Sequence, residues 1–112
     1  MRMWGIDPKL MCTRHLLGEH CEMHMFAGSL DLGRSVAGFI EKGLVALSRL
    51  KTRHDVLATE IEQRGYRHSS PLKTKKTWPK AGKIEVEANL IELARRCPEC
   101  RERQTDEGIE RA

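Results

Sequence analysis

Two carboxylates and an imidazole lie at helical intervals near the start of the chain. His15, Glu19 and Glu22 are spaced by four and then three residues, so on a helix their side chains share one face. Leu16 and Met23 flank this row. A carboxylate among apolar groups is desolvated, which raises its pKa and suits it to proton transfer. The row is therefore a candidate for acid–base chemistry, and the alternative is an ordinary solvated helix face.

The α-amine of the first residue is the other candidate reactive group. An initiator methionine is normally removed only when the second residue is small, so Arg2 predicts that Met1 stays in place. An α-amine is a usable nucleophile near neutral pH, because part of it is then unprotonated. The alternative is a frayed terminus without chemical function.

The cysteines are expected to be reduced thiols. Cys12 and Cys21 lie nine residues apart on one expected helix, a rise of about 13 Å that a disulfide cannot bridge. Cys97 and Cys100 have the spacing of half a zinc site. A structural zinc ion there would need His or Cys ligands from elsewhere in the fold or from a second copy of the chain.

A metalloenzyme is a further interpretation of the first helix. That helix offers donor atoms on Cys12, His15, Glu19, Glu22 and His24. At 100° per residue, however, His24 is expected to project about 180° away from His15. The five donors are therefore not expected to meet at one ion without a contribution from another segment.

The positive charge of the chain is concentrated in one segment. The net charge is +4, and residues 64–84 carry basic side chains but no acidic ones. Residues 66–83 are rich in Ser, Pro, Gly and Lys, which predicts a long loop. Lysines interleaved with rings are typical of nucleic-acid surfaces, and a solvated linker is the alternative. The candidate contacts are Lys73, Lys75, Lys76, Trp78 and Lys80.

The periodicity of apolar residues predicts an all-α protein. Three apolar stripes at helical spacing must bury one another, so we expect a compact single-domain bundle of three main helices with a long basic loop. The domain is expected to cover residues 1–112, of which 101–112 form a frayed charged tail. The expected helices cover about residues 8–26, 44–64 and 85–97, with a short helical turn at 36–42.

Local signals mark where these helices begin and end. Asp7 before Pro8 is a helix-start signal. Gly28 is the expected exit of the first helix and Gly65 of the second. His54 falls within the apolar stripe of the second helix, where a structural histidine is a better expectation than a metal ligand.

The composition gives no sign of a membrane or secreted protein. The chain contains no run of 18 apolar residues, and its first residues form no apolar signal region. We therefore expect a soluble, cytoplasmic protein. The sequence leaves its oligomeric state open.

Three stretches of the chain carry a resemblance to a known family. They are Met1-Arg2, His15-Leu16 with Glu19 and Glu22, and Leu50-Lys51-Thr52-Arg53-His54 through Glu62-Gln63-Arg64-Gly65-Tyr66. Together they resemble the pyrimidine dimer DNA glycosylases of the phage endonuclease V type. The resemblance covers about residues 1–70 and implies a compact all-α fold. It also implies a bifunctional enzyme, which cuts the glycosidic bond of a damaged pyrimidine and then breaks the backbone of double-stranded DNA by β-elimination.

The resemblance also implies roles for individual residues. The α-amine of Met1 would attack C1′ of the sugar and form a Schiff base, and no cofactor would be required. Glu22 would stabilise positive charge and assist proton abstraction during elimination. Arg2 would contact a phosphate, while His15 and Glu19 match a histidine and a first glutamate on the family's first helix.

Departures from the family pattern leave the substrate open. Cys21 and Met25 stand where the family carries arginines on the first helix. The family's aromatic, basic C-terminal tail is absent, and Trp78 and the lysine loop are the candidates to replace it. A different flipped base or an abasic site is therefore an alternative substrate. The alternative function is a non-catalytic nucleic-acid-binding protein with a structural zinc site at Cys97 and Cys100.

Overall fold

The computed structural model describes residues 1–73 and 78–111, with side chains up to residue 105. Its regular secondary structure consists of helices. Within those ranges the chain contains no strand, so the predicted all-α class is confirmed. Lys75 and Lys76, two of the predicted DNA contacts, lie outside the described residues. The elements are η1 (Pro8–Leu10), α1 (Thr13–Asp31), α2 (Ala37–Glu41), η2 (Leu47–Arg49), α3 (Leu50–Gln63), α4 (Val86–Arg96) and α5 (Pro98–Arg111).

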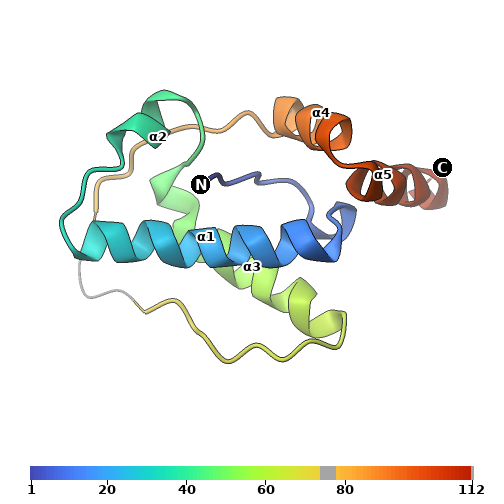
Figure 1. Ribbon diagram of the computed structural model, residues 1–112, viewed down its shortest axis with the longest axis horizontal. Helices are drawn as coiled ribbons and strands as arrows, with labels where there is room; N and C mark the ends of the chain where they lie inside the picture. The colour runs from blue at the N-terminus through green and yellow to red at the C-terminus, as the bar shows by residue number, and fades with distance from the viewer. Residues whose placement is uncertain (74–77, 112) are drawn as a thin grey trace.

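Helices α1 and α3 cross at the centre of the molecule and form its main helix–helix contact (Figure 1). Helices α4 and α5 lie together at one end, where α5 also contacts η1 (Figure 1). None of the helices that the structure describes has both the length and the apolar character that a membrane crossing requires. The principal extents of the chain are 44 × 31 × 20 Å.

The first helix begins and ends later than the sequence predicted. Asp7 does cap a helical turn, η1, by accepting a hydrogen bond from the Lys9 amide at 3.0 Å. Met11 is extended, however, and its carbonyl accepts a hydrogen bond at 2.7 Å from the Arg64 guanidinium. The helix then continues past Gly28 to Asp31. The left-handed residue of the following turn is Gly33, with φ +73°.

The second predicted helix is divided in two. The chain forms the short turn η2 before α3 begins at Leu50, because Ala46 is extended and the Leu47 amide bonds to the Ala81 carbonyl at 2.8 Å. The predicted stop at Gly65 is confirmed, since this residue has φ +88° and its amide bonds to the Glu62 carbonyl at 2.9 Å.

The expected frayed tail is wrong for residues 101–111, which belong to helix α5. Pro98 is a favourable first helical residue and Glu99 lies in the first turn, where a negative charge is stabilised. Cys97 and Cys100 are buried at the junction with α4, and the Arg103 guanidinium donates to the Lys9 carbonyl at 3.0 Å. The described part of the chain therefore has four longer helices where three were expected.

The N-terminal segment is part of the core. Met3 and Ile6 are almost completely buried, and the Met3 amide donates to the Leu44 carbonyl at 2.7 Å. Aliphatic residues and methionines from the helices surround them. Other fully buried side chains are Met11, Leu16, Met23, Phe26, Val45, Leu50, Leu57 and Leu93. The start of the chain is consequently held in place two residues after the amine.

Candidate active site

The α-amine of Met1 lies beside the carboxylate of Glu22. The amine nitrogen is 3.8 Å from Glu22 Oε1, and both side chains are partly buried, with exposed fractions of 17% for Met1 and 31% for Glu22. The backbone amide of Arg2 also donates a hydrogen bond to the Glu22 carboxylate. Helix α1 thus presents the carboxylate, and the buried Met3 fixes the amine next to it. This is the pair that the sequence singled out as the catalytic candidates.

Burial changes the chemistry of the Glu22 carboxylate. Desolvation raises its pKa above the usual range for a glutamate, and the charge of the amine and the Arg2 hydrogen bond partly oppose that shift. A carboxylate with a raised pKa accepts a proton more readily than an exposed one. Glu22 is therefore suited to act as a general base toward a group held next to Met1.

The amine and the carboxylate open onto a cleft of about 660 Å³. A volume of this size is within the range of pockets that bind small organic groups. Arginines from three segments line the cleft and give it a positive rim. The lining residues are Met1, Arg2, Trp4, Arg14, His15, Gly18, Glu19, Cys21, Glu22, Leu44 and Arg96.

Arg2 is held by α4 and by an aromatic ring. Its guanidinium lies 3.9 Å from the centroid of the Trp4 ring and donates to Asn89 Oδ1 at 2.6 Å. Arg96, at the end of α4, lies over the same ring at 5.8 Å. Sequence reasoning predicted Arg2 but missed Arg14 and Arg96. Only the position of Arg14 beside His15 could have indicated one of them.

Glu19, predicted as a substrate contact, is fully occupied by an ion pair. Arg53 from α3 donates to both of its carboxylate oxygens, at 2.6 and 2.9 Å, and both side chains are buried. Arg53 also donates to the Ile6 carbonyl at 2.6 Å. The pair therefore joins α1, α3 and the N-terminal segment, and so helps to position Met1. A substrate contact by Glu19 stays a prediction.

His15 belongs to a group of sulfur ligands. Its Nδ1 is 3.2 Å from Cys12 Sγ and 3.7 Å from Cys100 Sγ, and Cys12 Sγ is 3.9 Å from Cys97 Sγ. The donor atoms of these four residues all lie within 4.8 Å of one another, and the three thiols are buried. The predicted half-site at Cys97 and Cys100 is thus completed from the start of α1. Cys21 is exposed and does not belong to the group.

The five-donor metalloenzyme set is not brought together. His15 faces the thiols and Glu22 faces the amine, whereas His24 Nε2 lies 3.0 Å from His54 Nε2 on another side of α1. The reason is the helical rotation between positions 15 and 24.

The lysine loop is described only in part. Lys73 and Lys80 are exposed, as a phosphate contact requires. Trp78 instead packs partly buried against the core, and its indole N–H donates to the Leu47 carbonyl at 3.1 Å. Its ring is therefore less available for stacking on a base than the sequence suggested, and its role in DNA binding stays a prediction.

The fold and the cleft define a small all-α protein in which a terminal amine and a partly buried carboxylate line a cleft with a positive rim. The family model for pyrimidine dimer DNA glycosylase matches residues 1–74, and the chain belongs to this family. No curated protein and no solved structure matches the chain. Met1, Glu22 and α1 to α3 lie within the matched region, whereas α4, α5 and the thiols of Cys97 and Cys100 lie beyond it.

Proposed function

We propose that the protein is a DNA glycosylase with AP lyase activity that uses the α-amine of Met1 as its nucleophile. The observation that carries the proposal is the 3.8 Å contact between this amine and Glu22 at the base of the cleft. Membership of the family supplies the substrate class, a damaged pyrimidine in DNA. The cleft volume of about 660 Å³ is compatible with one flipped nucleotide.

The proposed reaction requires only the amine and the carboxylate. The unprotonated Met1 nitrogen forms a bond to C1′ as the bond from C1′ to the base breaks. The base leaves with the electron pair of that bond and takes up a proton from solvent. The nitrogen loses a proton and the sugar ring opens as O4′ takes up a proton, which gives a positively charged Schiff base. Glu22 then removes a proton from C2′, the C3′–O bond breaks, and the 3′ phosphate leaves. Water hydrolyses the imine and returns the free amine.

The cationic rim is the proposed contact for the DNA backbone. Arg2, Arg14 and Arg96 border the cleft, and planar guanidinium groups bind phosphate oxygens in pairs. Lys73 and Lys80 are exposed on the loop segment and would add phosphate contacts outside the cleft. Such contacts hold double-stranded DNA without reading its sequence, so the lesion would be selected inside the cleft.

A structural zinc ion is the second part of the proposal. Cys12, His15, Cys97 and Cys100 offer three thiolates and one imidazole, which is a common ligand set of closed zinc sites. An ion there would tie the junction of α4 and α5 to the start of α1. A Cys100→Ser variant should lose one bound zinc per chain and unfold at a lower temperature. The exposed Cys21→Ser variant is the matched control and should retain both properties.

Reductive trapping tests the catalytic proposal. The protein is incubated with borohydride and duplex DNA that carries either an abasic site or a pyrimidine dimer, and the mass of the covalent adduct is mapped. The proposal expects an adduct at the nitrogen of Met1. A protein that forms no adduct with either DNA, but still binds both in a salt-sensitive way, would instead be the non-catalytic binding protein. Comparison of the two DNAs shows whether the lesion or only the abasic site is the substrate.

A further inference from the structure

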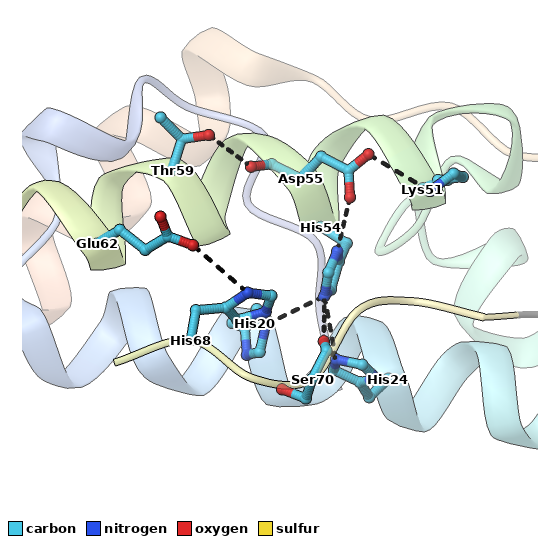
Figure 2. Close-up of polar contacts among 9 residues, drawn as sticks. All are labelled: His20, His24, Lys51, His54, Asp55, Thr59, Glu62, His68 and Ser70. Atoms are coloured by element: carbon cyan, nitrogen blue, oxygen red, sulfur yellow. Dashed lines mark hydrogen bonds and ion pairs between the residues drawn. The ribbon is translucent and has the colours of Figure 1, made fainter. Parts of the chain in front are cut away.

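Four imidazole rings lie together on the side of α1 away from the cleft, and three of them, His20, His54 and His68, bring one ring nitrogen each within 4.8 Å of one another (Figure 2). His20 and His24 project from neighbouring turns of α1, His54 from α3, and His68 from the segment that follows α3. The Nε2 atom of His54 is 3.1 Å from that of His20 and 3.0 Å from that of His24, and His20 Nε2 is 3.0 Å from His68 Nε2.

The outer nitrogens of two of these rings face carboxylates. His54 Nδ1 is 2.9 Å from Asp55 Oδ1, and His68 Nδ1 is 3.7 Å from Glu62 Oε1. An ionised carboxylate only accepts hydrogen bonds, so it places the proton of a neutral ring on Nδ1 and leaves a lone pair on Nε2. A carboxylate behind an imidazole is the usual second partner of a metal-binding histidine.

Single ring nitrogens at the centre of this cluster face several partners at once. His54 Nε2 faces two imidazole nitrogens and also the Ser70 carbonyl oxygen, at 3.1 Å. With its proton on Nδ1, His54 presents a lone pair that opposes the lone pairs of the carbonyl. A cation that all the lone pairs can share removes this repulsion.

We propose that His20, His54 and His68 bind a divalent transition metal ion through their ring nitrogens, which lie within 4.8 Å of one another, while the neighbouring His24 ring contacts the Ser70 carbonyl at 3.0 Å. Zinc is the best chemical match, because neutral imidazoles suit it and it accepts four ligands at tetrahedral positions. Ligands that lie 2.0–2.1 Å from zinc are about 3.3 Å apart in a tetrahedron, close to the separations of 3.1 Å between His20 and His54 and 3.0 Å between His20 and His68. An all-nitrogen set does not suit calcium or magnesium, which prefer oxygen ligands.

The ion would join three segments that are distant in sequence. It would hold α1 against α3, and it would fix the segment around His68 and Ser70 that leads to the lysine loop. None of the four histidines lines the cleft that contains Met1 and Glu22. We therefore assign the ion a structural role, and this inference does not depend on the proposed catalytic function.

Metal content provides the first test. Protein expressed with added zinc is dialysed against metal-free buffer, and zinc per chain is measured by plasma mass spectrometry. His68→Gln and His20→Gln should each bind one zinc less than the unmodified protein, with an unchanged far-UV circular dichroism spectrum. Arg67→Gln, an exposed neighbour of His68, is the matched control and should keep the full content. Both histidines are only partly buried, so their variants should fold even where a His54 variant does not.

Cobalt provides a second readout, which separates the two clusters. Thiolate-bound cobalt has an intense charge-transfer absorption that an all-nitrogen site lacks. His68→Gln should therefore lower the cobalt stoichiometry by one without reducing that absorption, whereas Cys100→Ser should remove the absorption. Equal metal content in the unmodified protein, His68→Gln and His20→Gln would overturn the proposal and leave a hydrogen-bonded cluster of neutral rings. Loss of charge-transfer absorption in His68→Gln would also overturn it, because the ion lost would then be the one on the thiols.

Discussion

The two sides of helix α1 carry different kinds of polar group. On one side Glu22 meets the Met1 amine in an open cleft with a positive rim. On the other side His20 and His24 meet two further imidazoles beneath the segment that follows α3. The first side leaves a nucleophile accessible, whereas on the second side the Nε2 atoms of the imidazoles face one another. The comparison suggests that one helix separates reaction chemistry from the contacts that hold the chain together.

The largest expected effect comes from blocking the amine. One glycine added before Met1 replaces the nucleophile by an amide, so covalent trapping and strand nicking should fall below detection. DNA binding and zinc content should be nearly unchanged, because the added residue does not touch the histidine side of α1. Gel-based nicking and equilibrium binding assays on the same preparation measure both. Nicking at the normal rate by the extended protein would remove Met1 from the mechanism.

Removal of the Glu22 charge should have the next largest effect. Positioned acids and bases contribute roughly 10²- to 10⁴-fold to rates, so Glu22→Gln should slow nicking by a factor in that range. The amine remains, so borohydride should still trap an adduct. Glu41→Gln, an exposed carboxylate on α2, is the control and should nick normally. Single-turnover kinetics with abasic DNA measures the rate of nicking. An unchanged rate in Glu22→Gln would mean that another group removes the proton from C2′.

The buried ion pair of Glu19 and Arg53 joins α1 to α3 and to the N-terminal segment. Arg53→Met leaves the Glu19 carboxylate buried without its partner, a change that typically costs about 3–5 kcal/mol of unfolding free energy. The double variant with Glu19→Met should recover part of this loss. Lys51→Met removes an exposed pair with Asp55 and should change stability little. Urea unfolding compares the four proteins, and equal losses in Arg53→Met and Lys51→Met would contradict the assigned role.

The smallest expected effect is on the exposed lysines. If Lys73 and Lys80 contact phosphates, changing both to glutamine should weaken DNA binding similarly for every sequence. The slope of log affinity against log salt should fall by about 2, roughly one for each lost contact. Zinc content and the rate of nicking at saturating DNA should not change. Binding titrations at several salt concentrations measure the slope, and an unchanged slope would place both lysines outside the interface.

Local spacing predicted what lies within one helix. The row of His15, Glu19 and Glu22 lies on α1 as expected, because the helical repeat fixes neighbours three and four residues apart. Glycine predicted the end of α3 at Gly65 because only a residue without a Cβ adopts its φ of +88° at no cost. The all-α class followed from the same periodicity.

Contacts between helices could not be predicted in this way. Glu19 and Arg53 are 34 residues apart, and no local pattern states which helices cross or at which residues. For the same reason His54 was expected to be a structural histidine, although three other imidazoles meet it. Helix α5 was missed because the charged residues after position 100 outweighed the start signal at Pro98. Completion of the Cys97 and Cys100 half-site by Cys12 and His15 likewise depended on the crossing of distant segments.

The burial of Met3 has a consequence for the local concentration of the amine. Two residues of extended chain reach about 7 Å, so the nitrogen of Met1 is confined to a small sphere around its anchor. One group in a sphere of that radius corresponds to a concentration on the order of 1 M, well above the millimolar values of longer flexible linkers. A sugar carbon bound in the cleft would therefore meet a nucleophile far more concentrated than any free amine in solution.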